Sequence, residues 1–180
     1  MPAQKDESKY LVTGYTGKFV AKLDSKNRLT IPASLRKTHL PSKSRSKKEK
    51  NRFMLTRGLD GGLTLFPITE WKRIEERLSE IPFTHRDFRH FTRILYSEAA
   101  EVVLDSQGRI PISKDHKDLV GLRHETLIIG VGRWIEIWNP DRYQGYIGGV
   151  GISYETAAEQ LFPGNNEAES AHTGAGRKGA

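Results

Sequence analysis

The sequence contains no cysteine and no long apolar run. Without cysteine the chain forms no disulfide bonds or thiolate metal sites, which fits a reducing compartment. No stretch of 18 or more apolar residues is present, so no membrane-spanning helix is predicted. Residues 1–9 are polar and lack the apolar segment of a secretory signal. Together these absences predict a soluble, cytoplasmic protein.

Patterns that would indicate an enzyme, a nucleotide site or a metal site are also missing. No serine lies in a Gly-X-Ser-X-Gly elbow, and the glycine-rich segments lack a phosphate-loop lysine. His85, Asp87 and His90 have ligand-like side chains, but a five-residue spacing does not put both imidazoles on one helix face. His116 and His124 are expected in loops without a partner. We therefore expect no catalytic residues, no cofactor and no metal.

The excess positive charge lies in one segment. The net charge is +7, and residues 36–52 hold eight Lys/Arg and one acid, so the rest of the chain is neutral. A concentrated basic run is typical of proteins that bind a polyanion, most often nucleic acid. The alternative is a disordered, solvated loop that only aids solubility, and charge alone does not decide between them.

What the sequence does contain is an internal repeat. Residues 23–32 have the sequence LDSKNRLTIP, and residues 104–113, 81 positions later, have the related sequence LDSQGRIPIS. Both copies have an Asp at the start of a tight turn and an Arg at its end. Asn27 and Gly108 occupy the position where a positive φ is expected. One structural unit of about 70 to 80 residues is therefore used twice.

Apolar periodicity predicts the same order of elements in both units. The first unit is expected to contain strands at 16–23, 29–31, 53–56 and 63–66, a short helix at 33–39, and a helix that Thr69 caps and Pro82 ends. The second is expected to contain strands at 100–104, 110–112, 127–131 and 134–138, and helices at 115–120 and from Pro140. A connecting amphipathic helix is predicted from about His85 to Ala100.

The distance between equivalent residues changes within the repeat. Residues 65–71 correspond to residues 137–143, an offset of 72 rather than 81. The first unit therefore carries nine extra residues, which fall in the basic segment. Pro41 to Asn51 is low in complexity, and no regular structure is predicted there.

These features resemble the MraZ family of bacterial transcriptional regulators, which are built from two AbrB-like swapped-hairpin modules. The resemblance rests on the order of elements over residues 14–146 and on the segments 55–61, 105–109 and 136–138. The sequence departs from the family at Asn27, where a Gly is usual, and in the basic insertion and the longer N-terminal arm. Asn also adopts positive φ, so the turn is expected to be retained.

The resemblance implies an α+β fold in which two tandem AbrB-like modules form an intrachain pseudo-dimer barrel, with amphipathic helices between and after them. The implied divisions are a flexible arm at 1–13, a first module at 14–82 with a basic insertion at 37–52, a connecting helix at 83–99, a second module at 100–148, and a C-terminal helix and disordered tail at 149–180. The expected core residues are Phe19, Leu23, Leu29, Ile31, Leu55, Leu65, Val102, Leu104, Ile110, Ile112, Ile128, Ile135 and Ile137. Trp71 and Trp138 are expected to pack in the core or an interface.

The two turns are the candidate DNA-binding sites. Arginine suits bidentate contact with guanine or a phosphate. From the residues alone, a simple Asp–Arg surface pair is the favoured explanation, and the family resemblance reverses that preference. The resemblance implies DNA contact by Lys26, Arg28, Arg36, Gln107 and Arg109, with Asp24 and Asp105 orienting the turns.

The function implied is a sequence-specific DNA-binding regulator, chiefly a repressor, of the cell-division and cell-wall gene cluster. Copies of the chain would form a ring associated with the nucleoid and bind tandem promoter repeats of double-stranded DNA. The helices between residues 69 and 100 and those after Trp138 are the expected oligomer contacts. Two alternatives remain: an AbrB-type antitoxin, and a general nucleic-acid-binding protein that acts through the basic insertion.

Overall fold

The computed structural model describes residues 14–37 and 51–162, which contain eight strands and six helices. The chain divides into two compact units, residues 1–145 and residues 146–180. The first unit contains all eight strands. The second contains the end of α5 and the helix α6 (Tyr154–Leu161), whose first turn is capped by Ser153.

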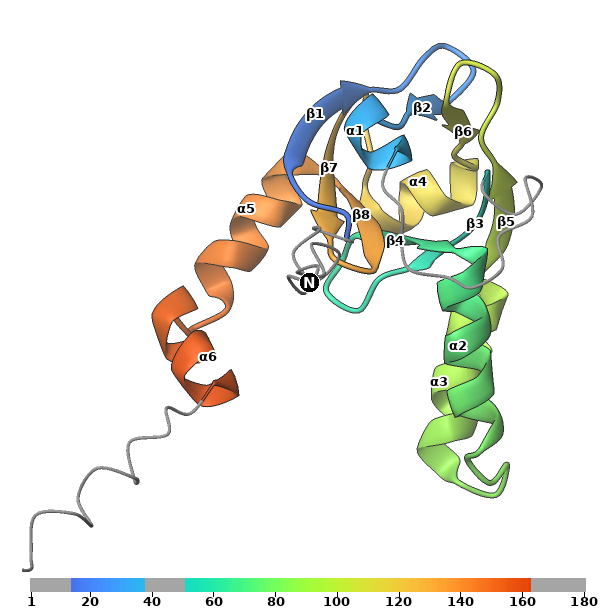
Figure 1. Cartoon of the computed structure of the whole chain (residues 1–180), viewed down its shortest axis with the longest axis vertical. Helices are drawn as coiled ribbons and strands as arrows, with labels where there is room; N and C mark the ends of the chain where they lie inside the picture. The colour runs from blue at the N-terminus through green and yellow to red at the C-terminus, as the bar shows by residue number, and fades with distance from the viewer. Residues whose placement is uncertain (1–13, 38–50, 163–180) are drawn as a thin grey trace, which may run out of the picture. The chain divides into compact units, whose positions relative to one another are not determined.

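Both repeats have the same sequence of elements (Figure 1). The first consists of β1 (Lys18–Lys22), β2 (Arg28–Thr30), α1 (Ala33–Arg36), β3 (Arg52–Arg57), β4 (Leu63–Pro67) and α2 (Ile68–Ser79). The second consists of β5 (Ala100–Val103), β6 (Arg109–Pro111), α4 (Lys114–Val120), β7 (Glu125–Val131), β8 (Trp134–Trp138) and α5 (Pro140–Gly149). The connecting helix is α3 (Arg86–Ser97). The predicted strands and the mixed α+β class are therefore confirmed.

The repeats exchange strands instead of forming separate sheets. The main antiparallel sheet has the order β1-β7-β8-β4-β3-β5, and β2 pairs with β6 in a two-stranded ribbon. The first strand of each repeat thus pairs with the third strand of the other repeat: β1 pairs with β7, and β5 pairs with β3. The two hairpins meet through β4 and β8, where Thr64 lies opposite Glu136. This arrangement interlocks the two halves of the chain.

The core lies between the main sheet and the β2–β6 ribbon. Successive side chains of a strand point to opposite faces of the sheet, so every second residue points into the core. Leu29, Leu55, Leu65, Ile110, Ile128, Ile135 and Ile137 are fully buried. Every predicted core residue is buried except Phe19, which is partly buried and packs against the cluster. Trp71 and Trp138 are also buried, as predicted.

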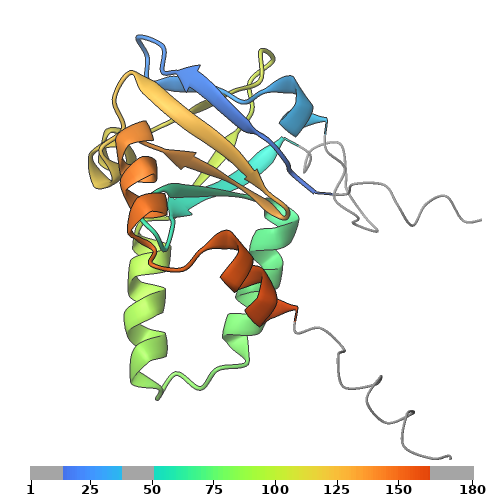
Figure 2. The ribbon, with the colours of Figure 1, turned by 90° about the vertical axis from the view of Figure 1, so that its left-hand side faces the viewer.

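The helices α2 and α3 extend from one end of the sheet (Figure 2). Trp71 anchors the start of α2 by packing edge-on against Tyr96 of α3, with ring centroids 5.8 Å apart. The prediction that Thr69 caps α2 is wrong, because the helix begins at Ile68 directly after Pro67, a residue with no side-chain cap. In the second repeat the side chain of Asn139 caps α5, since its Oδ1 accepts hydrogen bonds from the backbone N–H groups of Asp141 and Arg142.

Within residues 14–37 and 51–162, no helix combines the length and the apolar character that a membrane crossing requires.

Candidate nucleic-acid interface

The side chain of Asp24 holds the first turn together. Its Oδ1 accepts hydrogen bonds from the backbone N–H groups of Lys26 and Arg28, both at 2.9 Å. Its Oδ2 accepts from Arg28 Nε at 2.8 Å and lies 2.7 Å from Nη2. Asn27 has a φ of 55°, as the sequence predicts. One carboxylate therefore fixes both the turn backbone and the guanidinium group that follows it.

The second turn repeats this geometry. Asp105 Oδ1 accepts from the backbone N–H groups of Gln107 and Arg109 at 2.9 Å, and Oδ2 accepts from Arg109 Nε at 2.8 Å. Nη2 of Arg109 lies 2.8 Å from the same oxygen. Gly108 takes the positive φ, at 76°. The sequence repeat is thus a repeat of detailed side-chain geometry.

The hydrogen bonds at each turn lower the pKa of its aspartate. The backbone N–H of Arg28, followed by the Arg28 side chain, lowers the pKa of Asp24 from its ordinary value of 3.8 to about 2. The equivalent bonds from Arg109 lower the pKa of Asp105. Both carboxylates are therefore ionised at neutral pH and remain paired with their arginines.

The two turns lie next to each other, beyond β2 and β6 (Figure 1). The backbone N–H of Ile31 donates to the carbonyl of Gly108, and that of Ile112 donates to the carbonyl of Asn27, both at 2.9 Å. Arg109 Nη1 is 3.8 Å from Asp24 Oδ2, so the second arginine also approaches the first carboxylate. The two guanidinium groups consequently belong to one surface.

The other predicted contact residues surround this pair. Lys26 and Gln107 are exposed at the equivalent tips of the two turns. Arg36 ends α1, and its Nε donates to the carbonyl of Ile31 at 2.9 Å. The guanidinium of Arg36 covers Gly108, where an added Cβ would lie 2.6 Å from the arginine Cζ. The structure thus brings Arg36 to the turn of the opposite repeat.

Lys117 is a further basic residue at this surface that the sequence analysis missed. Its Nζ donates to Asn27 Oδ1 at 2.6 Å, so α4 contacts the first turn as α1 contacts the second. The 81-residue offset would have found it, because Lys117 is the equivalent of Arg36. When the 81-residue offset is extended from the turns into the helices that follow them, it pairs Arg36 of α1 with Lys117 of α4.

This arrangement supplies oriented donors and little else. A guanidinium has five N–H donors in a fixed fork, and one carboxylate does not use all of them. The side chains of Arg28 and Arg109 are 31% and 23% exposed, so part of each fork is accessible. Anionic oxygens or the acceptor edge of guanine match such donors. Asp24 and Asp105 position the arginines and would repel a phosphate that approached them directly.

Only the ends of the basic insertion belong to the described residues. Residues 38–50, which contain most of its charge, lie outside the described residues. Arg52 belongs to β3 and pairs with Glu101 of β5 through two hydrogen bonds of 2.6 and 2.7 Å. That arginine therefore connects neighbouring strands of the two repeats.

The expectation for His116 is wrong. It lies in α4, is buried, and its ring contacts Ser113 Oγ at 2.9 Å and the carbonyl of Glu98 at 2.7 Å. His116 occupies the position in the second repeat that Leu35, also buried, occupies in the first. A polar ring fits there because the end of α3 supplies the carbonyl of Glu98 as a hydrogen-bond partner. His85 and His90 are exposed near the start and along the length of α3. Over residues 14–37 and 51–162, no cluster of three or more potential metal ligands occurs.

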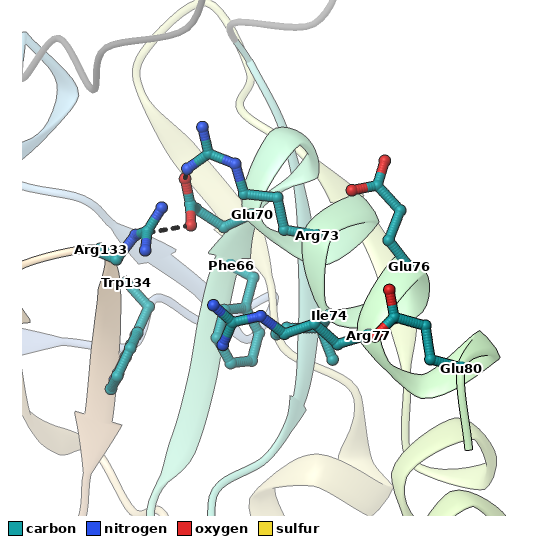
Figure 3. A pocket seen from close by; sticks show the side chains of 9 residues that line it. All are labelled: Phe66, Glu70, Arg73, Ile74, Glu76, Arg77, Glu80, Arg133 and Trp134. Atoms are coloured by element: carbon teal, nitrogen blue, oxygen red, sulfur yellow. Dashed lines mark hydrogen bonds and ion pairs between the residues drawn. The ribbon is translucent and has the colours of Figure 1, made fainter.

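A second polar cluster lies in a groove beside α2 (Figure 3). The Glu70 carboxylate is 9% exposed, accepts a 2.6 Å hydrogen bond from Arg73 Nη1 and lies 2.9 Å from Arg133 Nε. The groove, of about 380 Å³, contains three arginines and three glutamates, so its charges are balanced. Glu70 connects α2 to the β7–β8 turn and has a structural role.

The sequence matches known proteins over most of its length. A family model described as "MraZ protein, putative antitoxin-like" matches residues 15–94 and again residues 95–163. Relatives named "Transcriptional regulator MraZ" include proteins from Lactobacillus delbrueckii subsp. bulgaricus, at 40% identity, and Pelotomaculum thermopropionicum, at 39%. A third, from Syntrophomonas wolfei, is 37% identical. Each alignment covers 82% of this chain and 94 to 96% of the relative. The family resemblance is thereby confirmed, and the chain belongs to the MraZ family.

Proposed function

We propose that this protein is a transcriptional regulator that binds double-stranded DNA through its two Asp-X-X-X-Arg turns. The observation that carries the proposal is the pair of guanidinium groups, each fixed by an aspartate, on two adjacent turns. Fixed arginines lose little conformational entropy when they bind, which favours specific contact over loose charge attraction. The name shared by the relatives, "Transcriptional regulator MraZ", supports the same function.

The residues at this surface have distinct proposed roles. Arg28 and Arg109 contact guanine edges in the major groove through their forked donors. Lys26, Gln107 and Arg36 contact the phosphate backbone, while Asp24 and Asp105 orient the arginines. The basic insertion adds affinity that depends on salt and is independent of sequence.

The two repeats are proposed to be AbrB-like swapped-hairpin modules that form a pseudo-dimer barrel within one chain. The pairing of β1 with β7 and of β5 with β3 supports this interpretation, because each hairpin requires the other repeat. The module boundaries at residues 14–82 and 100–148 remain part of the proposal.

A single pair of turns offers a small contact area, so binding is proposed to depend on several copies of the chain. By family resemblance, the copies form a ring that binds tandem repeats about one helical turn apart, which places the sites on one face of the duplex. Exposed apolar side chains on and between α2 and α3, among them Ile81, Phe83 and Phe91, support contacts between copies.

The proposed role is repression of the cell-division and cell-wall gene cluster, at the nucleoid in the cytoplasm.

A double variant that retains charge tests the role of the turns. Arg28→Lys/Arg109→Lys keeps both positive charges and removes both forked donors. Binding to the DNA upstream of the protein's own gene and to a scrambled duplex would be measured by fluorescence anisotropy over a salt series. We expect the preference for the native duplex to disappear while the salt dependence stays nearly constant.

An unchanged preference in this variant would show that the forks do not recognise sequence. Equal binding of both duplexes by the wild type would favour general nucleic-acid binding through the insertion. No binding to either duplex would favour the antitoxin-like function in the family description.

A further inference from the structure

Asn27, at the tip of the first turn, is held on three sides. Its backbone N–H donates to the carbonyl of Asp24 at 2.9 Å, and its own carbonyl accepts from the N–H of Ile112 at 2.9 Å. Its side-chain Oδ1 accepts from Lys117 Nζ at 2.6 Å. These contacts fix both the backbone and the amide plane of a residue that already has a positive φ.

The contact with Lys117 determines which way the amide faces. An ammonium group has only donors, so the amide oxygen must face Lys117 and the NH2 group must face away from it. Within residues 14–37 and 51–162, no group hydrogen-bonds to Asn27 Nδ2, and no buried side-chain polar atom lacks a partner. The NH2 group is therefore a donor presented to solvent at the tip of the turn.

The second turn does not provide this donor. Gly108 has no side chain, and the guanidinium of Arg36 occupies the space that a side chain at this position would need. Lys117, the equivalent of Arg36, leaves room for the amide of Asn27. The two turns therefore match in their arginines and differ in the group at their tips.

We propose that Asn27, oriented by Lys117, is a donor-only DNA contact specific to the first turn. This inference rests on the proposed function. The NH2 group needs an acceptor on the DNA, and the O6/N7 edge of guanine and the phosphate oxygens offer acceptors without a neighbouring donor or methyl group. The usual bidentate pairing of Asn with adenine needs both the amide oxygen and the NH2 group, and Lys117 occupies the oxygen. The first turn thus cannot form the bidentate adenine contact at this position, and the two halves of the interface present different donor groups.

The test uses the full-length chain and its upstream DNA in anisotropy titrations. Asn27→Gly removes the amide and keeps the turn, because Gly readily adopts positive φ. Lys117→Met removes the group that orients the amide, and Lys18→Met at the start of β1, away from the turn, removes one positive charge as a matched control. We expect Asn27→Gly to weaken binding by about threefold to tenfold, the effect of one hydrogen bond. The double variant Asn27→Gly/Lys117→Met should bind DNA no more weakly than the weaker-binding single variant, because Lys117 acts through Asn27.

Two further duplexes distinguish the sources of the acceptor. For guanine N7, a duplex with 7-deazaguanine should bind the wild type more weakly and should abolish the difference between wild type and Asn27→Gly. For guanine O6, which 7-deazaguanine retains, the difference should persist on that duplex and disappear on the scrambled duplex. For a phosphate, Asn27→Gly should lose the same factor on the native, scrambled and 7-deazaguanine duplexes. Each of these patterns supports a donor-only contact.

Three results would overturn the inference. Unchanged binding by Asn27→Gly, with loss of binding by Arg28→Ala/Arg109→Ala, would remove Asn27 from the interface and leave the proposed function intact. Independent, additive losses from Asn27→Gly and Lys117→Met would show that Lys117 does not act through Asn27. If the arginine variant also bound normally, the proposed function itself would fail.

Discussion

Asp24 and Asp105 determine how the candidate DNA-binding arginines are presented. Each carboxylate accepts two backbone N–H groups and pairs with one guanidinium group, with the same distances in both turns within 0.1 Å. A surface Asp–Arg ion pair by itself adds little to stability, whereas the backbone hydrogen bonds that the carboxylate accepts stabilise the turn. The benefit of pairing the guanidinium group is therefore expected in binding, because an oriented arginine loses less freedom when it meets DNA.

Asp24→Asn should weaken DNA binding by about threefold to tenfold, because the amide presents a donor toward Arg28 Nε and releases the guanidinium. Circular dichroism would establish that the variant is folded, and anisotropy would measure the affinity. Affinity equal to that of the wild type would show that the carboxylate does not position Arg28.

The same carboxylate predicts a pH dependence. Its pKa is lowered to about 2 by the hydrogen bonds from Arg28, so the folded state favours the ionised form. The resulting stabilisation is fully present above the ordinary pKa of 3.8 and is lost as the pH falls toward 2. Thermal melts of wild type and Asp24→Asn should therefore differ by a constant amount from pH 5 to pH 8 and converge below pH 4. A difference that changed between pH 5 and pH 8 would contradict this assignment.

Among the secondary-structure elements, the strands followed from the sequence better than the helix ends and helix contacts. Alternating apolar residues and two glycine-rich hairpins predicted all eight strands, and Asn27 was expected to take a positive φ. The cap of α2 and the burial of His116 were not predicted, because they depend on which residues pack nearby. Lys117 was missed for a related reason: its contact with Asn27 spans 90 residues and exists only because the repeats exchange strands.

The basic insertion is a separable element in this account. Replacing residues 38–50 with a Gly/Ser linker of equal length keeps the connection between Lys37 and Asn51. We expect the preference for the native duplex to persist, while the log–log salt slope falls by about 1 for each lysine or arginine that contacted phosphate. Anisotropy over a salt series measures both quantities. Loss of the preference would move the site of sequence recognition from the turns to the insertion.

For the whole molecule, the exchange of strands means that neither repeat holds a complete sheet. In the main sheet β1 pairs with β7 alone, and β5 pairs with β3 alone, so each edge strand depends on the other half of the chain. The arginine pair also depends on this exchange, because the β2–β6 ribbon joins the two turns. Fold and candidate site are therefore formed together.

Separate fragments should show this dependence directly. Fragments 14–94 and 95–162 are each expected to fail to form a folded monomer, and mixing them should restore a cooperative thermal transition. Circular dichroism melts combined with size-exclusion chromatography would test this. A folded, monomeric single repeat would contradict the interlocked arrangement.

The most direct test of the central claim is the affinity ratio between the native upstream duplex and a scrambled duplex. It would be measured by anisotropy for wild type, for Arg28→Ala/Arg109→Ala, and for the charge-matched control Lys18→Ala/Arg57→Ala, two exposed residues at the ends of β1 and β3 away from the turns. We expect a ratio well above one for wild type and control, and a ratio near one for the turn variant while it remains folded. A ratio retained by the turn variant would contradict the claim that the paired turn arginines recognise DNA sequence.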